Sequence, residues 1–106
     1  MRVSRYDLYG IQADDIHEAR ARVESALGIR MAPHESSYRG GEYFRLGNVG
    51  NENFILQRNY DNGEAEWTEP THTKYSILLY VSETNRGREI TVAMAGVGVL
   101  LRTEDL

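Results

Sequence analysis

The stretch YSILLYV, residues 75–81, decides the fold. Its apolar side chains occupy successive positions, so a strand here would point apolar groups to both faces of a sheet. The polar residues Glu83, Thr84 and Asn85 follow it. The stretch therefore predicts a strand at the centre of a sheet that is covered on at least one face.

Three extended segments are predicted in the middle of the chain, between residues 29 and 60. Residues 42–46 (EYFRL) and 53–60 (NFILQRNY) are joined by a turn rich in Gly and Asn at 47–51, a pattern typical of a hairpin. Residues 29–35 (IRMAPHE) predict a short extended segment, because Pro33 lacks the amide donor that a central strand needs. We expect that segment at a sheet edge.

The N-terminal part of the chain predicts one strand and one helix. Residues 3–9 alternate, with Tyr6 and Leu8 on one face and Arg5 and Asp7 on the other, which predicts a half-buried strand. A helix is predicted over residues 14–27, capped by Asp14 or Asp15, with Glu18 closing a capping-box-like turn and Gly28 ending it. Its apolar positions follow a spacing of three and four residues: Ile16, Ala19, Val23, Ala26 and Leu27.

The C-terminal part predicts one further helix and one further strand. Residues 88–96 alternate like a strand but also fit a helix, and we favour a short second helix at about 86–95. The run VGVLLR at 97–102 predicts a last strand, followed by an acidic tail. The sequence therefore predicts one α+β domain over residues 1–106, with a mainly antiparallel sheet of about five to six strands.

Composition excludes several classes of function. The chain has 106 residues, a net charge of −4 and no cysteine, which excludes disulfide scaffolds, thiol nucleophiles and thiolate metal sites. The acidic surplus argues against direct nucleic-acid binding, and no run is long and apolar enough to span a membrane. No phosphate-binding glycine motif and no metal-ligand spacing occurs. We expect a soluble, cytoplasmic protein with no cofactor, no metal and no membrane or nucleic-acid partner.

The stretch DNGEAEWTE at 61–69 is the strongest candidate for a binding surface. It holds four carboxylates, no basic residue and the one tryptophan of the chain. On an exposed edge strand or loop it would attract a basic partner, and a tryptophan can serve as the anchor of an interface. The alternative is an ordinary solvated face. The candidate residues are Asp61, Glu64, Glu66, Trp67 and Glu69.

A second candidate is chemical. His34 and Glu35 stand beside Ser36 and Ser37, which are residue types used in nucleophilic catalysis, and a pocket near His34, Glu35 and Tyr38 would suit a small enzyme or a small-molecule binder. Neighbouring side chains of an extended segment point to opposite faces, however, so a relay needs a special loop geometry. The interpretation that we favour over catalysis is that these side chains satisfy backbone groups around an irregular edge strand. A third possibility is a structural subunit whose apolar strand edge pairs with a copy of itself.

The chain resembles the immunity proteins of bacterial polymorphic-toxin and contact-dependent growth inhibition systems. The most specific part is YRGGEY at 38–43 after HESS at 34–37. The resemblance covers nearly the whole chain and includes YDLYGI at 6–11, DDIHEAR at 14–20, VESALGI at 23–29, HESSYRGGEYF at 34–44, NFILQRN at 53–59 and SILLYV at 76–81.

The resemblance implies a small cytoplasmic protein without catalysis of its own. Such a protein binds one cognate toxin domain in a one-to-one complex and blocks it, and the toxin is often a basic nuclease that acts on tRNA or DNA. An acidic inhibitor suits a basic nuclease, because the nuclease must itself hold phosphate. The motif at 34–43 is then either scaffold or toxin contact, and Glu35, Arg39 and Glu42 form a second candidate patch.

Overall fold

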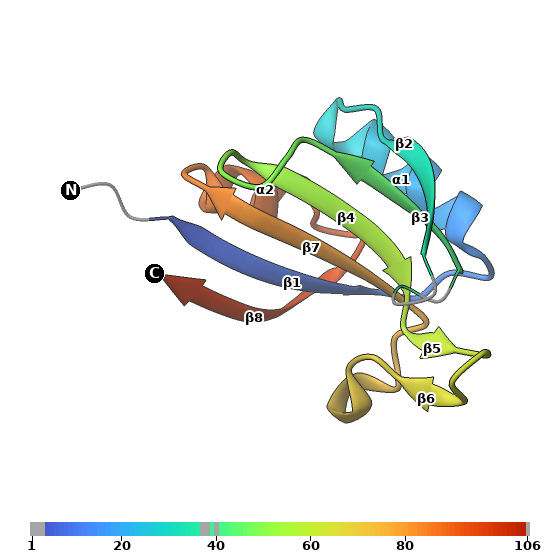
Figure 1. Ribbon diagram of the computed structural model, residues 1–106. Helices are drawn as coiled ribbons and strands as arrows, with labels where there is room; N and C mark the ends of the chain where they lie inside the picture. The colour runs from blue at the N-terminus through green and yellow to red at the C-terminus, as the bar shows by residue number, and fades with distance from the viewer. Residues whose placement is uncertain (1–3, 37–38, 40, 106) are drawn as a thin grey trace.

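A computed structural model describes residues 4–36, 39 and 41–105. Its main element is a six-stranded sheet in the order β2-β3-β4-β7-β1-β8, in which every neighbouring pair runs antiparallel. The strands are β1 (Arg5–Ile11), β2 (Ala32–Ser36), β3 (Gly41–Leu46), β4 (Asn53–Arg58), β7 (Ile77–Thr84) and β8 (Val99–Asp105). The helices are α1 (Ile16–Leu27) and α2 (Gly87–Ala93). The predicted α+β class and antiparallel sheet are confirmed (Figure 1).

The strand β7 lies at the centre of the sheet, as predicted. It pairs with β4 on one side and with β1 on the other. The side chains of Ile77, Leu78, Leu79 and Val81 are all buried. Both faces of β7 are therefore covered, which explains why its apolar residues occupy successive positions.

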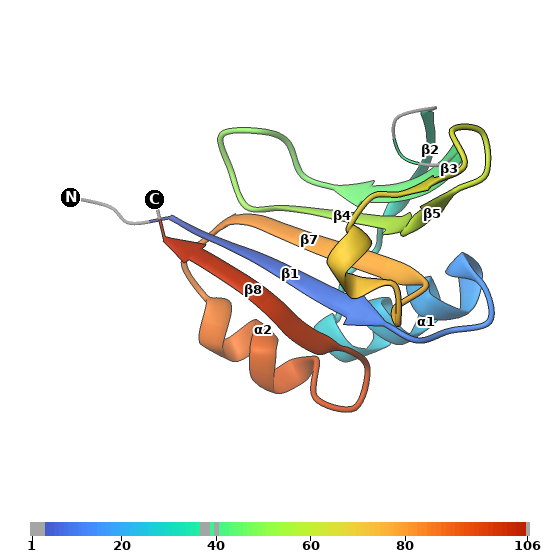
Figure 2. The same cartoon turned by 90° about the horizontal axis from the view of Figure 1, so that it is seen from below.

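Both helices cover the same face of the sheet (Figure 2). Ile16, Ala19 and Val23 of α1 join one apolar core with Ile90 of α2 and Met94, the residue that caps α2 at its C-terminal end. The sheet contributes to this core from four strands: Tyr9, Ile11, Phe44, Phe54, Leu56, Ile77, Leu79 and Val81. The predicted second helix is confirmed, because the helical spacing of Ile90 and Met94 places both side chains in the core.

The ends of α1 are fixed by its own sequence. The amide of Glu18 donates to Asp15 Oδ1 at 2.8 Å, and Glu18 Oε2 accepts from the amide of Asp14 at 3.1 Å. At the other end Gly28 adopts φ 65° and its amide donates to the carbonyl of Glu24 at 2.9 Å. A side chain at Gly28 would be strained in this left-handed conformation, so the predicted helix stop is confirmed with its cause.

Two expectations for the strands are wrong. The first strand buries both faces, because Asp7 lies on the helix side with its carboxylate fully buried and paired with Arg5 Nε at 2.8 Å. The acidic tail is not a tail, because Thr103, Glu104 and Asp105 continue β8 and pair with β1. Asp7 is held inside by a partner two residues away, whereas Glu104 and Asp105 keep exposed side chains and are ordered by backbone pairing with the other end of the chain.

The two edges of the sheet are β2 and β8. Pro33 lies in β2, so its predicted edge position is confirmed. Within residues 4–36, 39 and 41–105, none of the helices has the length and apolar character needed to cross a membrane.

The cap of α1 yields a prediction about stability. Asp15→Ala should lower the free energy of unfolding by about 1 kcal/mol, because the Glu18 amide loses its acceptor. Asp14→Ala is the matched control, since it removes a neighbouring carboxylate but no cap hydrogen bond. Urea unfolding of the two variants measures the difference, and equal losses would contradict the assignment of Asp15 as the cap.

Candidate functional site

An arm of residues 60–75 leaves the sheet between β4 and β7 (Figure 1). It contains β5 (Tyr60–Asp61), β6 (Glu66–Trp67) and the 3-10 helix η2 (Pro70–His72). Tyr60 pairs with Trp67 and Asp61 with Glu66, in a two-stranded ribbon separate from the main sheet. The acidic stretch at 61–69, expected as an edge strand or loop, therefore runs from the end of β5 through the tip of this ribbon and β6 to Glu69.

Three carboxylates lie on the ribbon. Asp61 Oδ1 accepts from the amides of Gly63 at 2.9 Å and Glu64 at 3.2 Å, which shapes the turn at the tip. The side chains of Glu64 and Glu66 are exposed. Among the described residues, none of these three carboxylates forms an ion pair. The ribbon therefore presents negative charge that the rest of the described chain does not neutralise.

The aromatic side chains of the ribbon pack on each other. The rings of Tyr60 and Trp67 meet edge to face, with centroids 5.0 Å apart. Trp67 nevertheless remains 37% exposed and Tyr60 36% exposed. A partner that covers this aromatic pair would bury apolar surface beside the carboxylates of the ribbon, and tryptophan and tyrosine are the residue types enriched in interface hot spots.

Glu69 differs from the other acidic residues of the stretch. Its carboxylate accepts from the Tyr80 hydroxyl at 2.6 Å and from Arg102 Nη1 at 3.1 Å, and its side chain is 15% exposed. Burial alone would raise the pKa of Glu69, but the bonds from Tyr80 and Arg102 outweigh it and lower that pKa. The pKa of Tyr80 is raised by burial and by the same bond. Glu69 anchors the arm to the sheet and is not a free charge of the binding surface.

The second candidate patch is divided between the two faces of the sheet. Glu42 lies on the helix side, where its carboxylate contacts His17 Nε2 at 3.1 Å, and Glu35 is its partner in the register of β2 and β3. Arg39 lies on the other face, where it donates to Gln57 Oε1 at 2.9 Å and covers the Tyr43 ring. These three residues do not form one surface.

The described residues of the candidate catalytic site around His34 are not brought together by the structure. His34 is exposed and stacks on Tyr43, with ring centroids 5.4 Å apart, while Glu35 points to the opposite face. Ser37 and Tyr38 lie outside the described residues. In the described ranges no group of three or more His, Cys, Asp or Glu is placed to hold a metal ion.

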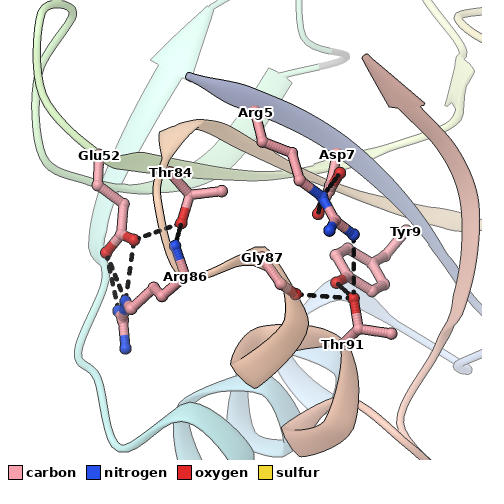
Figure 3. Close-up of polar contacts among 8 residues, drawn as sticks. All are labelled: Arg5, Asp7, Tyr9, Glu52, Thr84, Arg86, Gly87 and Thr91. Carbon is pink, nitrogen blue, oxygen red and sulfur yellow. Dashed lines mark hydrogen bonds and ion pairs between the residues drawn. The ribbon is translucent and has the colours of Figure 1, made fainter. Parts of the chain in front are cut away.

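Two charged networks that the sequence analysis missed lie at the opposite end of β7 from the arm (Figure 3). Arg5 Nε donates to both oxygens of Asp7, and Tyr9 and Thr91 share a hydrogen bond of 2.8 Å. The Thr91 hydroxyl in turn donates to the carbonyl of Gly87 at 2.9 Å. This network fixes α2 against β1. The sequence signal for this network is the spacing of Arg5 and Asp7, which are two residues apart and therefore lie on the same face of the strand.

The second network joins the β3–β4 turn to the loop before α2 (Figure 3). Glu52 accepts from Arg86 Nη2 at 2.8 Å and from the Thr84 hydroxyl at 2.7 Å. The bond from Arg86 lowers the pKa of Glu52. The adjoining hollow of about 350 Å³ is lined by the cations Arg5, Arg86 and Arg88 and by the carboxylates Glu89 and Asp105. Arg5 and Arg86 are already paired with Asp7 and Glu52, so the hollow does not present charge of one sign.

Comparison of the chain with protein-family models, with curated proteins and with solved structures finds no match. The geometry of the arm therefore carries the functional argument.

The anchor at Glu69 yields a prediction about pH. A carboxylate with a lowered pKa contributes stability above its unfolded pKa of about 4.3, and this contribution is lost as the pH falls through the folded pKa. Glu69→Gln should therefore cost on the order of 1 kcal/mol at neutral pH, and the cost should shrink below about pH 4. Urea unfolding of wild type and variant at both pH values tests this. A cost that does not change with pH would contradict the anchor.

Proposed function

We propose that this protein is an immunity protein, which binds a basic toxin domain and neutralises it by covering the active or substrate-binding surface. The observation that carries the proposal is the ribbon of the arm, where Asp61, Glu64 and Glu66 stand without cationic partners in the described chain beside a half-exposed Trp67. The sequence resemblance to immunity proteins supports the same role. A nuclease toxin suits this surface best, because its phosphate-binding cations would meet the carboxylates of the ribbon.

The two kinds of group on the ribbon would contribute differently. Exposed carboxylates accelerate the encounter with a cationic surface, and this effect weakens as salt is added. An aromatic anchor acts after the encounter, because the buried ring must be exposed to water again before the complex separates. The proposal therefore assigns the association rate mainly to the exposed carboxylates and the dissociation rate mainly to the aromatic anchor.

The binding test is direct. The tagged protein should capture, in a one-to-one complex, an inactive C-terminal fragment of the protein encoded immediately upstream of it. Co-expression should also protect cells from the active fragment. A folded protein that neither captures the fragment nor protects the cell would contradict the proposal.

Reversing the charge of the ribbon should slow association. Glu64→Lys with Glu66→Lys should lower the association rate about tenfold at low salt, with little change in the dissociation rate. The control is Glu89→Lys with Asp105→Lys, two exposed carboxylates at the other end of the sheet, because both pairs change the net charge from −4 to zero. Surface plasmon resonance at several salt concentrations measures both rates. Equal slowing by the two pairs would assign the effect to net charge and contradict a role for the ribbon.

Removing the aromatic anchor should speed dissociation. Trp67→Ala should cost about 2 kcal/mol of binding free energy, or about thirtyfold in dissociation rate, while the association rate stays near that of wild type. The control is Val92→Ala, which removes an apolar side chain that is 76% exposed on α2. A Trp67→Ala complex that dissociates at the wild-type rate would exclude Trp67 from the interface.

A further inference from the structure

Asn59 joins the two ends of the arm. Its backbone N–H donates to the carbonyl of Ser76 at 2.9 Å, so the chain leaves β4 and returns to β7 at one point. Its own carbonyl accepts from the amide of Thr68 at 2.7 Å, which ties the outgoing side of the arm to the returning side. The backbone of one residue thus closes the arm at its base and again after β6.

The side chain of Asn59 uses all its polar atoms on the same segment. Nδ2 donates to the carbonyls of His72 and Tyr75, both at 3.0 Å, and Oδ1 accepts from the amide of Glu69 at 2.8 Å. The residue is fully buried. An amide side chain is required here, because aspartate could not donate to the two carbonyls and an apolar side chain could neither donate nor accept.

Little else in the described chain orders the arm. Most of residues 60–74 are exposed, and β5 and β6 are two residues each, whereas an isolated two-stranded ribbon is marginal in water. The contacts of Glu69 with Tyr80 and Arg102 hold one point of the arm. Asn59 makes most of the remaining connections to its base, and Gln12 Nε2 adds one to the carbonyl of Lys74 at 3.4 Å, where the arm returns to the sheet.

We propose that Asn59 is a positioning residue, which holds the arm in its binding geometry before any partner arrives. This inference rests on the proposed function of the ribbon and extends it to a residue that is buried and does not itself face a partner. An arm that is ordered in the free protein binds without the loss of conformational freedom that ordering would require. Asn59 therefore affects the binding affinity indirectly, by fixing the position of the ribbon.

The first test uses the free protein. In wild type, the amides of Thr68 and Glu69 should exchange hydrogen slowly, since both donate to Asn59. Asn59→Ala should raise exchange over residues 60–75 at least tenfold and lower the fluorescence anisotropy of Trp67, the one tryptophan of the chain, while β4 and β7 stay protected. The matched control is Asn62→Ala at the exposed tip of the same arm, which should change neither signal.

Three results would overturn the ordering role. These are unprotected Thr68 and Glu69 amides in wild type, an arm in Asn59→Ala that exchanges like wild type, or an equal effect of Asn62→Ala. Asn59→Asp keeps the size and the Oδ1 acceptor but loses both donors, so it provides the same comparison if the alanine variant does not fold. Unprotected amides in wild type would overturn the ordering role without either variant, and protected amides leave the comparison of the variants to assign the order to Asn59.

The second test uses the C-terminal toxin fragment. Asn59→Ala should weaken its binding about tenfold, while the salt dependence of association stays that of wild type because no charge has changed. If the ribbon charge reversal weakens binding but Asn59→Ala does not, the positioning role is wrong and the proposed function stands. If wild type does not bind the fragment, the proposed function fails, and the exchange data alone decide whether Asn59 orders the arm.

Discussion

The need to cover β7 on both faces constrains the rest of the structure. Ile77, Leu79 and Val81 point toward the helices, and this core accounts for the apolar faces of α1 and α2. Leu78 and Tyr80 point the other way, and Leu78 is fully buried as well. The half-buried Tyr80 hydroxyl needs a polar partner on that face, and Glu69 of the arm provides it. The position of the arm thus follows partly from the second face of the central strand.

The parts of the fold that could be predicted from the sequence are those fixed by short-range pattern. The successive apolar residues of β7, the Asp15 cap and Gly28 each act within a few residues, and all three predictions are confirmed. Asp7 was assigned to solvent because alternation treats every charged position as exposed. Its partner Arg5 is only two residues away, but no pattern of apolar residues reveals that such a pair lies inside.

The candidate site was predicted in composition but not in arrangement. The sequence identifies the acidic stretch and Trp67, and the structure places both on a ribbon. The role of Glu69 could not be predicted, because its partners Tyr80 and Arg102 lie 11 and 33 residues away in the chain. The division of the second patch has a similar cause, since Arg39 comes from the turn between β2 and β3 and its direction is set by Gln57.

The arm combines an ordered base with a tip that is unfavourable for the free protein. Like charges on a short ribbon repel one another, and an exposed aromatic pair leaves apolar surface in water. Burying the aromatic pair in an apolar core would remove the cost of exposing apolar surface to water, but it would also hide that pair from a partner. Hydrogen bonds at Asn59 and an ion pair at Glu69 order the base without covering the tip. A cationic partner with an apolar recess would relieve both costs at once, so the features that make the arm unfavourable in isolation would strengthen its binding to such a partner.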